Sequence, residues 1–202
     1  MKTSKKQPYN LRKRKVSIKQ SMVLLLISLL FLACKTPEPR RPVSQESDTF
    51  IKESIEINKE LVAYEENLIK EIIEEDTTHN YITSAHGFWY YYEKENPAVD
   101  VKKPEFGDKV IFTYNISRLD GTPIYTTEEI GERVYFMDKE NLFTGLRQGL
   151  KLMEEGETLT FLFPSYTAFG YYGDNQKIGT NMPIKSTVSL QSIQPQDSIN
   201  SK

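Results

Sequence analysis

The sequence predicts an α+β fold, and three observations indicate this class. Apolar residues recur at helical spacing between Asp48 and Asp76, and the chain after Thr77 holds several segments rich in β-branched and aromatic residues. One short stretch with helical spacing lies among those segments. Strands on both sides of a single helix are typical of an antiparallel sheet wrapped on that helix, here preceded by a long amphipathic helix.

The first 33 residues are predicted to be a signal peptide. Eight Lys and Arg residues and no acidic residue precede Cys34, and the apolar run 22–32 follows them. As a helix this run would span roughly 17 Å, against about 30 Å of bilayer hydrocarbon. It therefore suits the signal of an exported protein better than a membrane-spanning anchor.

Cys34 is the only cysteine, and Ala33-Cys34 after the apolar run resembles the bacterial lipobox. That resemblance implies a lipid on Cys34 and a protein anchored to the membrane of the bacterial cell envelope, facing the periplasm. The alternative is a cleaved signal that happens to contain a cysteine. A lone cysteine excludes an intramolecular disulfide. Residues 34–47 are proline-rich and polar, which is typical of a tether.

Residues 48–82 are predicted to be an extension built around one amphipathic helix. Asp48 is the expected N-cap, and apolar residues then recur every three or four positions up to Ile73, with Lys and Glu between them. An apolar face of this length must be buried. Two partners are open: the chain's own main domain, or a second copy of the chain, which would form a homodimer through residues 48–76.

The domain over residues 83–202 is expected to hold five strands and one short helix. The expected strands are Gly87–Glu95, Val110–Ile116, Glu132–Met137, Glu157–Phe163 and Ser186–Ile193, separated by turn signals such as Asp120-Gly121. The helix is expected over Asn141–Met153, where Leu142, Leu146, Leu150 and Met153 share one face.

Composition and motifs disfavour several classes of function. From Cys34 on, 18 basic residues stand against 28 acidic ones, a formal charge of −10 that disfavours nucleic acid as a partner. The two histidines, His79 and His86, have no clustered ligands around them, so no metal site is expected. The sequence has no Gly-rich phosphate loop, and an exported protein meets no ATP. A cofactor-free activity based on aromatic and aliphatic side chains is therefore favoured.

The order of motifs in the second half resembles an FKBP-type peptidyl-prolyl cis-trans isomerase domain. The motifs are FGDKVIFTYN, RLDGTPIYTT, VYFM, NLFTGLRQGLKLMEEGE, FLFPSYTAFG and NMPIKSTVSLQSI, which together cover roughly residues 107–194. The most specific piece is G-L-x-x-G-L-x-x-M-x-x-G at 145–156. The signal cysteine, the acidic helix, RRPVS at 40–44 and GFWYYY at 87–92 further resemble the gliding-motility-associated lipoprotein branch of that family.

The resemblance implies an apolar catalytic pocket built from separated segments. The pocket residues, by position, are Tyr114, Tyr125, Phe136, Leu142, Phe143, Leu146, Phe169 and Val188. The backbone of Leu142 and Phe143 is expected to hold a substrate carbonyl, and Leu146 to form the floor. Tyr166 and Phe169 of the aromatic stretch 163–173 are expected over the pocket, with core packing as the alternative for Phe163. Two departures from the family stand out: Thr126 replaces an Asp, and Phe169 lacks a phenol.

The implied function is isomerisation of X-Pro bonds in proline-containing polypeptides, without a metal or another cofactor. On an envelope lipoprotein this activity would assist the folding of exported proteins, among them parts of a gliding or secretion machinery. One alternative is a non-catalytic chaperone or binding module that uses the same apolar cleft. Another is a structural lipoprotein whose helix over 48–76 mediates assembly.

Overall fold

The computed structural model describes residues 44–97 and 102–196, with side chains from Phe50 onward. Residues 48–202 form one compact unit. The predicted signal peptide, the lipid attachment at Cys34 and residues 35–43 of the tether lie outside the described residues and stay predictions.

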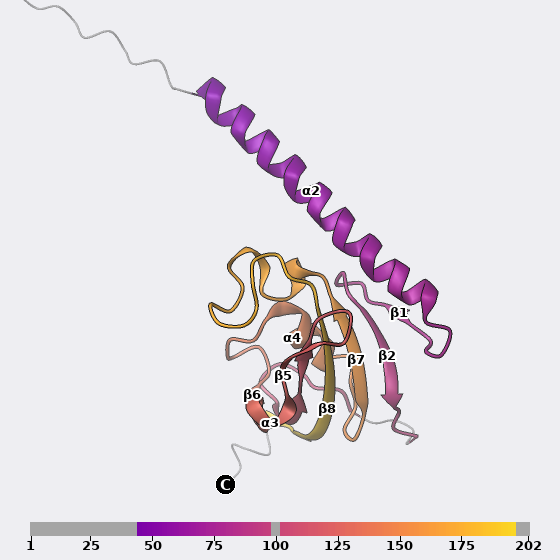
Figure 1. The fold of residues 1–202 in the computed structure, drawn as a ribbon. Coiled ribbons are helices and arrows are strands. Elements are labelled where there is room, and N and C mark those ends of the chain that lie inside the picture. The colour runs from indigo at the N-terminus through magenta and orange to yellow at the C-terminus, as the bar shows by residue number, and fades with distance from the viewer. Residues whose placement is uncertain (1–43, 98–101, 197–202) are drawn as a thin grey trace, which may run out of the picture. The chain divides into compact units, whose positions relative to one another are not determined.

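The described chain begins with one long helix, α2 over Ser44–Glu75, and continues as a β-rich domain (Figure 1). The strands are β1 Ile82–Thr83, β2 Trp89–Lys94, β3 Lys109–Tyr114, β4 Ile116–Ser117, β5 Pro123–Tyr125, β6 Arg133–Phe136, β7 Thr158–Phe163 and β8 Ile184–Gln194. The other helices are α3 Thr127–Ile130 and α4 Thr144–Leu150, and two 3-10 turns follow β7, η1 Ser165–Thr167 and η2 Gly170–Tyr172. The predicted α+β class is confirmed.

All strand pairs in the sheet are antiparallel, and the order is β1-β2-β7-β8-β3-β6, with β4 paired to β5 and to β8. Each of the five expected strands is present. The sequence analysis missed β1, β5 and α3 and did not separate β4 from β3, because these four elements are two to four residues long and too short to show a period.

The short helix α4 lies on one face of the sheet, and two glycines allow it to lie close. Leu146 and Leu150 of α4 are fully buried against Phe161 and Phe163 of β7. A Cβ added at Gly145 would lie 2.5 Å from the Phe163 ring, and one at Gly149 would lie 2.9 Å from the Phe161 ring. The glycines and leucines of the G-L-x-x-G-L motif therefore form the surface of α4 that contacts the sheet. The helix is shorter than the expected Asn141–Met153, because residue 143 is in an extended conformation.

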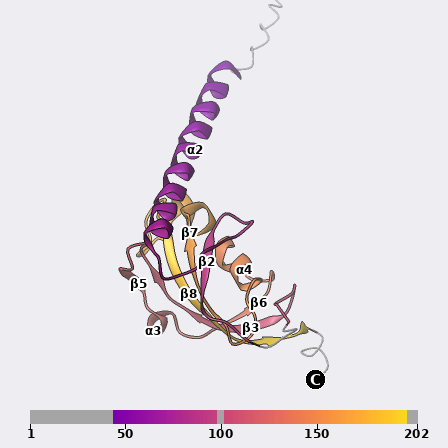
Figure 2. The ribbon, with the colours of Figure 1, turned by 90° about the vertical axis from the view of Figure 1, so that its right-hand side faces the viewer.

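The other face of the sheet is covered by the C-terminal half of α2, as Figure 2 shows. Ile69 of α2 is fully buried in a second, smaller apolar cluster with Trp89 of β2 and Leu162 of β7. The N-terminal half of α2 extends beyond the sheet in both views, and the side chains of Phe50 and Ile51 are more than half exposed. The chain's own domain is thus the partner of one half of the apolar face.

The start of α2 differs from the expected one. The helix begins at Ser44, before Asp48, so residues 44–47 belong to the helix and not to the tether. No proline or glycine lies between Pro42 and the end of α2, so nothing in the sequence stops the helix at Asp48. None of the helices within the described residues has the length and apolar character needed to cross a membrane.

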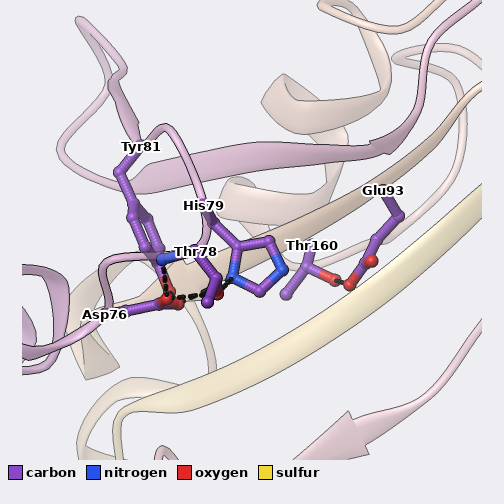
Figure 3. Close-up of polar contacts among 6 residues, drawn as sticks. All are labelled: Asp76, Thr78, His79, Tyr81, Glu93 and Thr160. Carbon is purple, nitrogen blue, oxygen red and sulfur yellow. Dashed lines mark hydrogen bonds and ion pairs between the residues drawn. The ribbon is translucent and has the colours of Figure 1, made fainter.

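The turn that follows α2 is fixed by a polar cluster around Asp76 (Figure 3). The Asp76 carboxylate accepts hydrogen bonds from the Thr78 hydroxyl and the Tyr81 phenol and lies 2.7 Å from His79 Nδ1. The His79 ring stacks on Tyr91 of β2, with centroids 4.0 Å apart. His79 therefore ties the end of α2 to the outer face of the sheet. Among the described residues, no group of three or more acidic, His or Cys side chains could hold a metal ion.

Candidate functional site

Seven of the eight predicted pocket residues belong to the main apolar core or lie against it. Leu146 of α4 and Val188 of β8 are fully buried in the core cluster. Five half-buried side chains pack on that cluster: Tyr114, Tyr125, Leu142, Phe143 and Phe169. Half-buried apolar side chains over a fully buried layer form the kind of surface on which an apolar ligand can lose its water.

Two of these rings are in direct contact. The centroids of Phe143 and Phe169 are 5.0 Å apart, and Phe143 also meets Phe163 edge-on at 5.4 Å. Phe143 immediately precedes α4 and has extended backbone angles. Its ring is therefore directed toward the loop after β7 and not along the helix axis. Tyr114, at the end of β3, pairs with Val188 of β8.

Backbone donors lie beside these rings, at the start of α4. Within residues 102–196, the N–H groups of Leu142 and Phe143 donate no hydrogen bond to another group. Unpaired N–H groups are expected at the beginning of a helix. They are consistent with the prediction that the backbone of this segment holds a substrate carbonyl.

Phe136 does not join this group. The core cluster takes in Tyr135 and Met137, its neighbours on both sides, but among the described residues Phe136 does not pack on that cluster. Successive side chains of a strand point to opposite faces, so Phe136 and Tyr135 of β6 cannot both face the core. The structure places Tyr135 in the core, and the role of Phe136 as a pocket wall stays a prediction.

Tyr125 contributes a phenol whose proton is already engaged. The hydroxyl donates to the carboxylate of Asp174 at 2.5 Å, and this hydrogen bond raises the pKa of Tyr125. Burial by itself would raise the pKa of Asp174, but the bonds from Tyr125 and from the N–H groups of Ile178 and Gln176 outweigh it and lower that pKa. The neighbour Ile124 is the residue of β5 that enters the core.

Asp174 is a residue that the sequence analysis missed. It follows Gly173 in the loop after η2 and lies 49 positions from Tyr125, so no local pattern connects the two. The family's acidic position falls on Thr126, and this side chain has another task. It caps α3 by accepting from the N–H of Glu129, whose own carboxylate accepts from the N–H of Thr126.

The aromatic stretch 163–173 is divided between three environments. Phe163 is fully buried, so core packing is the correct reading for that ring, and Phe169 alone reaches the predicted pocket. Tyr166 does not lie over the pocket as expected. Its hydroxyl donates toward Glu66 of α2 at 3.2 Å and toward the carbonyl of Gly87 at 3.1 Å. Tyr171 and Tyr172 at the loop tip are largely exposed.

The loop that follows β7 turns at two glycines. Gly170 has a φ of 60° and Gly173 a φ of 63°, in the region that favours glycine. A Cβ at Gly173 would also collide with the carbonyl oxygen of Ile178.

Comparison with known families supports the resemblance on which the site was built. Residues 100–191 match the family model of the FKBP-type peptidyl-prolyl cis-trans isomerases. This segment of the chain is therefore similar to an FKBP-type domain. This match supports isomerase activity, as the sequence analysis predicts.

Proteins similar to this chain include one from Neisseria meningitidis serogroup B, the probable FKBP-type peptidyl-prolyl cis-trans isomerase FkpA. The two sequences are 31% identical over 111 residues, which is 55% of this chain. The chain spans 39% of the length of that relative, so the match concerns a part of it.

Two solved structures have the same fold at low sequence identity. The peptidyl-prolyl cis-trans isomerase of Pseudomonas syringae pv. tomato is 17% identical, with a TM-score of 0.54 over 68% of this chain and 96% of that one. FkpA of Escherichia coli is 16% identical, with a TM-score of 0.55 over 90% of this chain and 84% of that one. The second match extends beyond the FKBP-type domain into the helical N-terminal part.

The chemistry available to the FKBP-type domain needs no nucleophile. An X-Pro amide rotates slowly because its C–N bond has partial double-bond character, with a barrier near 20 kcal/mol. In the twisted transition state this resonance is lost and the carbonyl oxygen carries less charge. An apolar surface therefore favours the twisted amide over the planar one, and the contacting rings of Phe143 and Phe169 are such a surface.

Proposed function

We propose that this chain is an FKBP-type peptidyl-prolyl cis-trans isomerase that acts on proline-containing segments of exported proteins. The observation that supports it best is the contact between the half-buried rings of Phe143 and Phe169 at the edge of the core, in a segment that matches this family. The substrates are proposed from the predicted export signal. No cofactor takes part in this reaction, because the apolar surface and the backbone donors suffice for it.

The test is prolyl cis/trans exchange in an Ala-Leu-Pro-Phe peptide, followed by NMR with and without the purified chain. The expected result is faster exchange that is lost in Phe169→Ala. Tyr172→Ala is the matched control, because its ring lies on the same loop but is 81% exposed. Equal rates with and without the folded wild-type protein would reject the isomerase.

A non-catalytic chaperone or binding module is the second candidate. Two observations favour it: Phe169 has no hydroxyl, and the phenol of Tyr125 is held by Asp174, so neither ring offers a free phenol to the substrate backbone. This candidate predicts that the peptide's NMR signals shift on binding while its exchange rate stays that of buffer.

We further propose that the protein is a lipoprotein of the bacterial cell envelope, anchored through Cys34 and facing the periplasm. The basic segment, the short apolar run and Ala33-Cys34 support this proposal. A lipid adds roughly 0.8 kcal/mol of membrane affinity for each buried CH₂ group. Cys34→Ala should therefore move the protein from the membrane fraction to the soluble fraction, and a protein that stays with the membrane would contradict the anchor.

The motifs shared with gliding-motility-associated lipoproteins support a role with clients of a gliding or secretion machinery. These motifs are the acidic helix, RRPVS at 40–44 and GFWYYY at 87–92. A host strain with Phe169→Ala should lose surface motility or secretion, whereas Tyr172→Ala should keep both. Normal motility and secretion in the Phe169→Ala strain would remove this role.

A homodimer through α2 is proposed for the half of the helix that its own domain leaves exposed. Ile51 is 57% exposed and Ile55 is 48% exposed, and both lie on the stripe that continues into buried Ile69. Ile51→Asp combined with Ile55→Asp should shift the sedimentation of the protein from dimer to monomer. Glu53→Lys, on the opposite side of the same helix, is the control, and a wild-type monomer at high concentration would reject the dimer.

A further inference from the structure

Glu65 of α2 is a buried carboxylate outside the aromatic site. Its side chain is 2% exposed, although it lies on a helix whose other acidic residues mostly face solvent. Burying a carboxylate is costly unless hydrogen bonds compensate for the lost water. Its burial therefore calls for a specific partner.

That partner is Ser165, which lies 100 positions away in the sequence. One oxygen of Glu65 accepts from the Ser165 N–H and the other from the Ser165 hydroxyl, both at 2.7 Å. Hydrogen bonds to an ionised acceptor are short and about twice as strong as those between neutral groups. The two bonds fix both the backbone and the side chain of Ser165.

Ser165 begins the tight turn that leads from β7 to Phe169. The turn is closed by bonds from the Thr167 hydroxyl to the Pro164 carbonyl and from the Ala168 N–H to the Ser165 carbonyl. On its other side the turn lies against α4, since the Thr167 carbonyl oxygen would be 2.9 Å from a Cβ at Gly145. The turn is thus held between α2 and α4.

A second contact ties the same turn to α2. The Tyr166 hydroxyl donates to Glu66 and to the Gly87 carbonyl. Burial and the neighbouring Glu66 carboxylate raise the pKa of Tyr166 to about 12, so the phenol keeps its proton and remains a donor. In Glu66→Gln the side-chain amide oxygen can still accept the bond from Tyr166, so this variant keeps the contact and serves as a control for the loss of a charge on α2.

We infer that Glu65 is a positioning residue for the site: through Ser165 it holds the turn that places the Phe169 ring against Phe143. The effect of Glu65 on catalysis rests on the proposed function, whereas its effect on the ring contact does not. The inference means that α2 helps to hold the site in shape, through the hydrogen bonds between Glu65 and Ser165. Misplacing a group by about 1 Å can lower a rate by about a hundredfold, so an effect of at least about tenfold is expected here.

The test compares Glu65→Ala, Glu65→Gln and Ser165→Ala with the matched control Glu66→Gln in the full chain. Two readouts are taken: prolyl exchange in Ala-Leu-Pro-Phe, and the nuclear Overhauser effect between the Phe143 and Phe169 rings in Phe-labelled protein. Glu65→Ala should weaken the ring contact and lower exchange at least about tenfold. Glu65→Gln and Ser165→Ala should fall between it and wild type, and Glu66→Gln should match wild type.

The ring contact separates positioning from simple loss of stability, because it is measured in the folded molecules alone. Wild-type ring contact and exchange in folded Glu65→Ala would overturn the inference. If Glu65→Ala does not fold, unchanged readouts in both Glu65→Gln and Ser165→Ala would overturn it. If the wild type itself does not accelerate exchange, the proposed isomerase fails. The ring contact then still decides whether Glu65 positions Phe169.

Discussion

The close approach of α4 to the sheet predicts that Gly145→Ala destabilises the protein, although alanine is the better helix former. The added Cβ would lie 2.5 Å and 2.7 Å from two atoms of the Phe163 ring and 2.9 Å from the Thr167 carbonyl oxygen. Phe163 is fully buried and the carbonyl belongs to the backbone, so neither can move freely. The helix or the turn must shift instead.

The size of the effect follows from two opposing contributions. Overpacking of a core costs typically about 1–3 kcal/mol, and three contacts under 3 Å place this site near the upper value. Replacing glycine by alanine in a helix returns about 0.5–1 kcal/mol. The expected net loss is about 2 kcal/mol of unfolding free energy, or roughly 4–8 °C in Tm for a unit of this size.

Urea denaturation followed by circular dichroism measures this loss directly. Gly179→Ala is the matched control, because a Cβ there would meet the Met182 side chain at an ordinary 3.6 Å. That variant should stay within about 0.5 kcal/mol of wild type. A Gly145→Ala protein as stable as Gly179→Ala would refute the packing argument.

Three further predictions concern other contacts. Tyr114→Ala removes a half-buried ring of the site and should slow prolyl exchange by about tenfold, or about 1.4 kcal/mol, in the NMR assay, with unchanged circular dichroism; an unchanged rate would count against the site. Tyr125→Phe removes a hydrogen bond that helps to keep the pKa of Asp174 low, so that pKa should rise in a carboxyl NMR titration; an identical titration curve would contradict the bond. Hydrogen bonds, first from the Thr78 hydroxyl and then from His79, hold the pKa of Asp76 below its usual value. Because the folded-state pKa is the lower one, these bonds stabilise the folded protein fully above the unfolded-state pKa of about 3.9. Their contribution to the unfolding free energy declines as the pH falls below that value. The Tm difference between wild type and Asp76→Asn should accordingly be constant above about pH 5 and shrink below about pH 4, and a constant difference down to pH 2 would refute this role.

The elements of the fold follow from local patterns in the sequence. The glycines and leucines of the G-L-x-x-G-L motif determine which side of α4 is buried, because a helix repeats every 3.6 residues whatever it packs against. The turns at Gly170 and Gly173 were also predictable, since positive φ angles favour glycine. The pocket residues, in contrast, were predicted by position from the resemblance to the FKBP-type family and not from a local pattern.

Strand register and partner choice depended on the tertiary structure. The sequence analysis selected Phe136 where the sheet turns Tyr135 inward, because a shift of one residue exchanges the two faces of a strand. Asp174 could not be linked to Tyr125, nor Tyr166 to α2, since each contact joins segments that are distant in the sequence.

By itself, the sequence determined the α+β class, the helical and strand segments and the apolar character of the site, because these depend on spacing along the chain. The tertiary structure alone decided that half of α2 covers the outer face of the sheet and that Glu65 holds Ser165. Both depend on burial and on hydrogen-bond partners 100 residues apart, which no local pattern records. Glu65 is one of the Lys and Glu residues between the apolar positions of the predicted amphipathic helix, and only the fold places its carboxylate against the turn that carries Phe169.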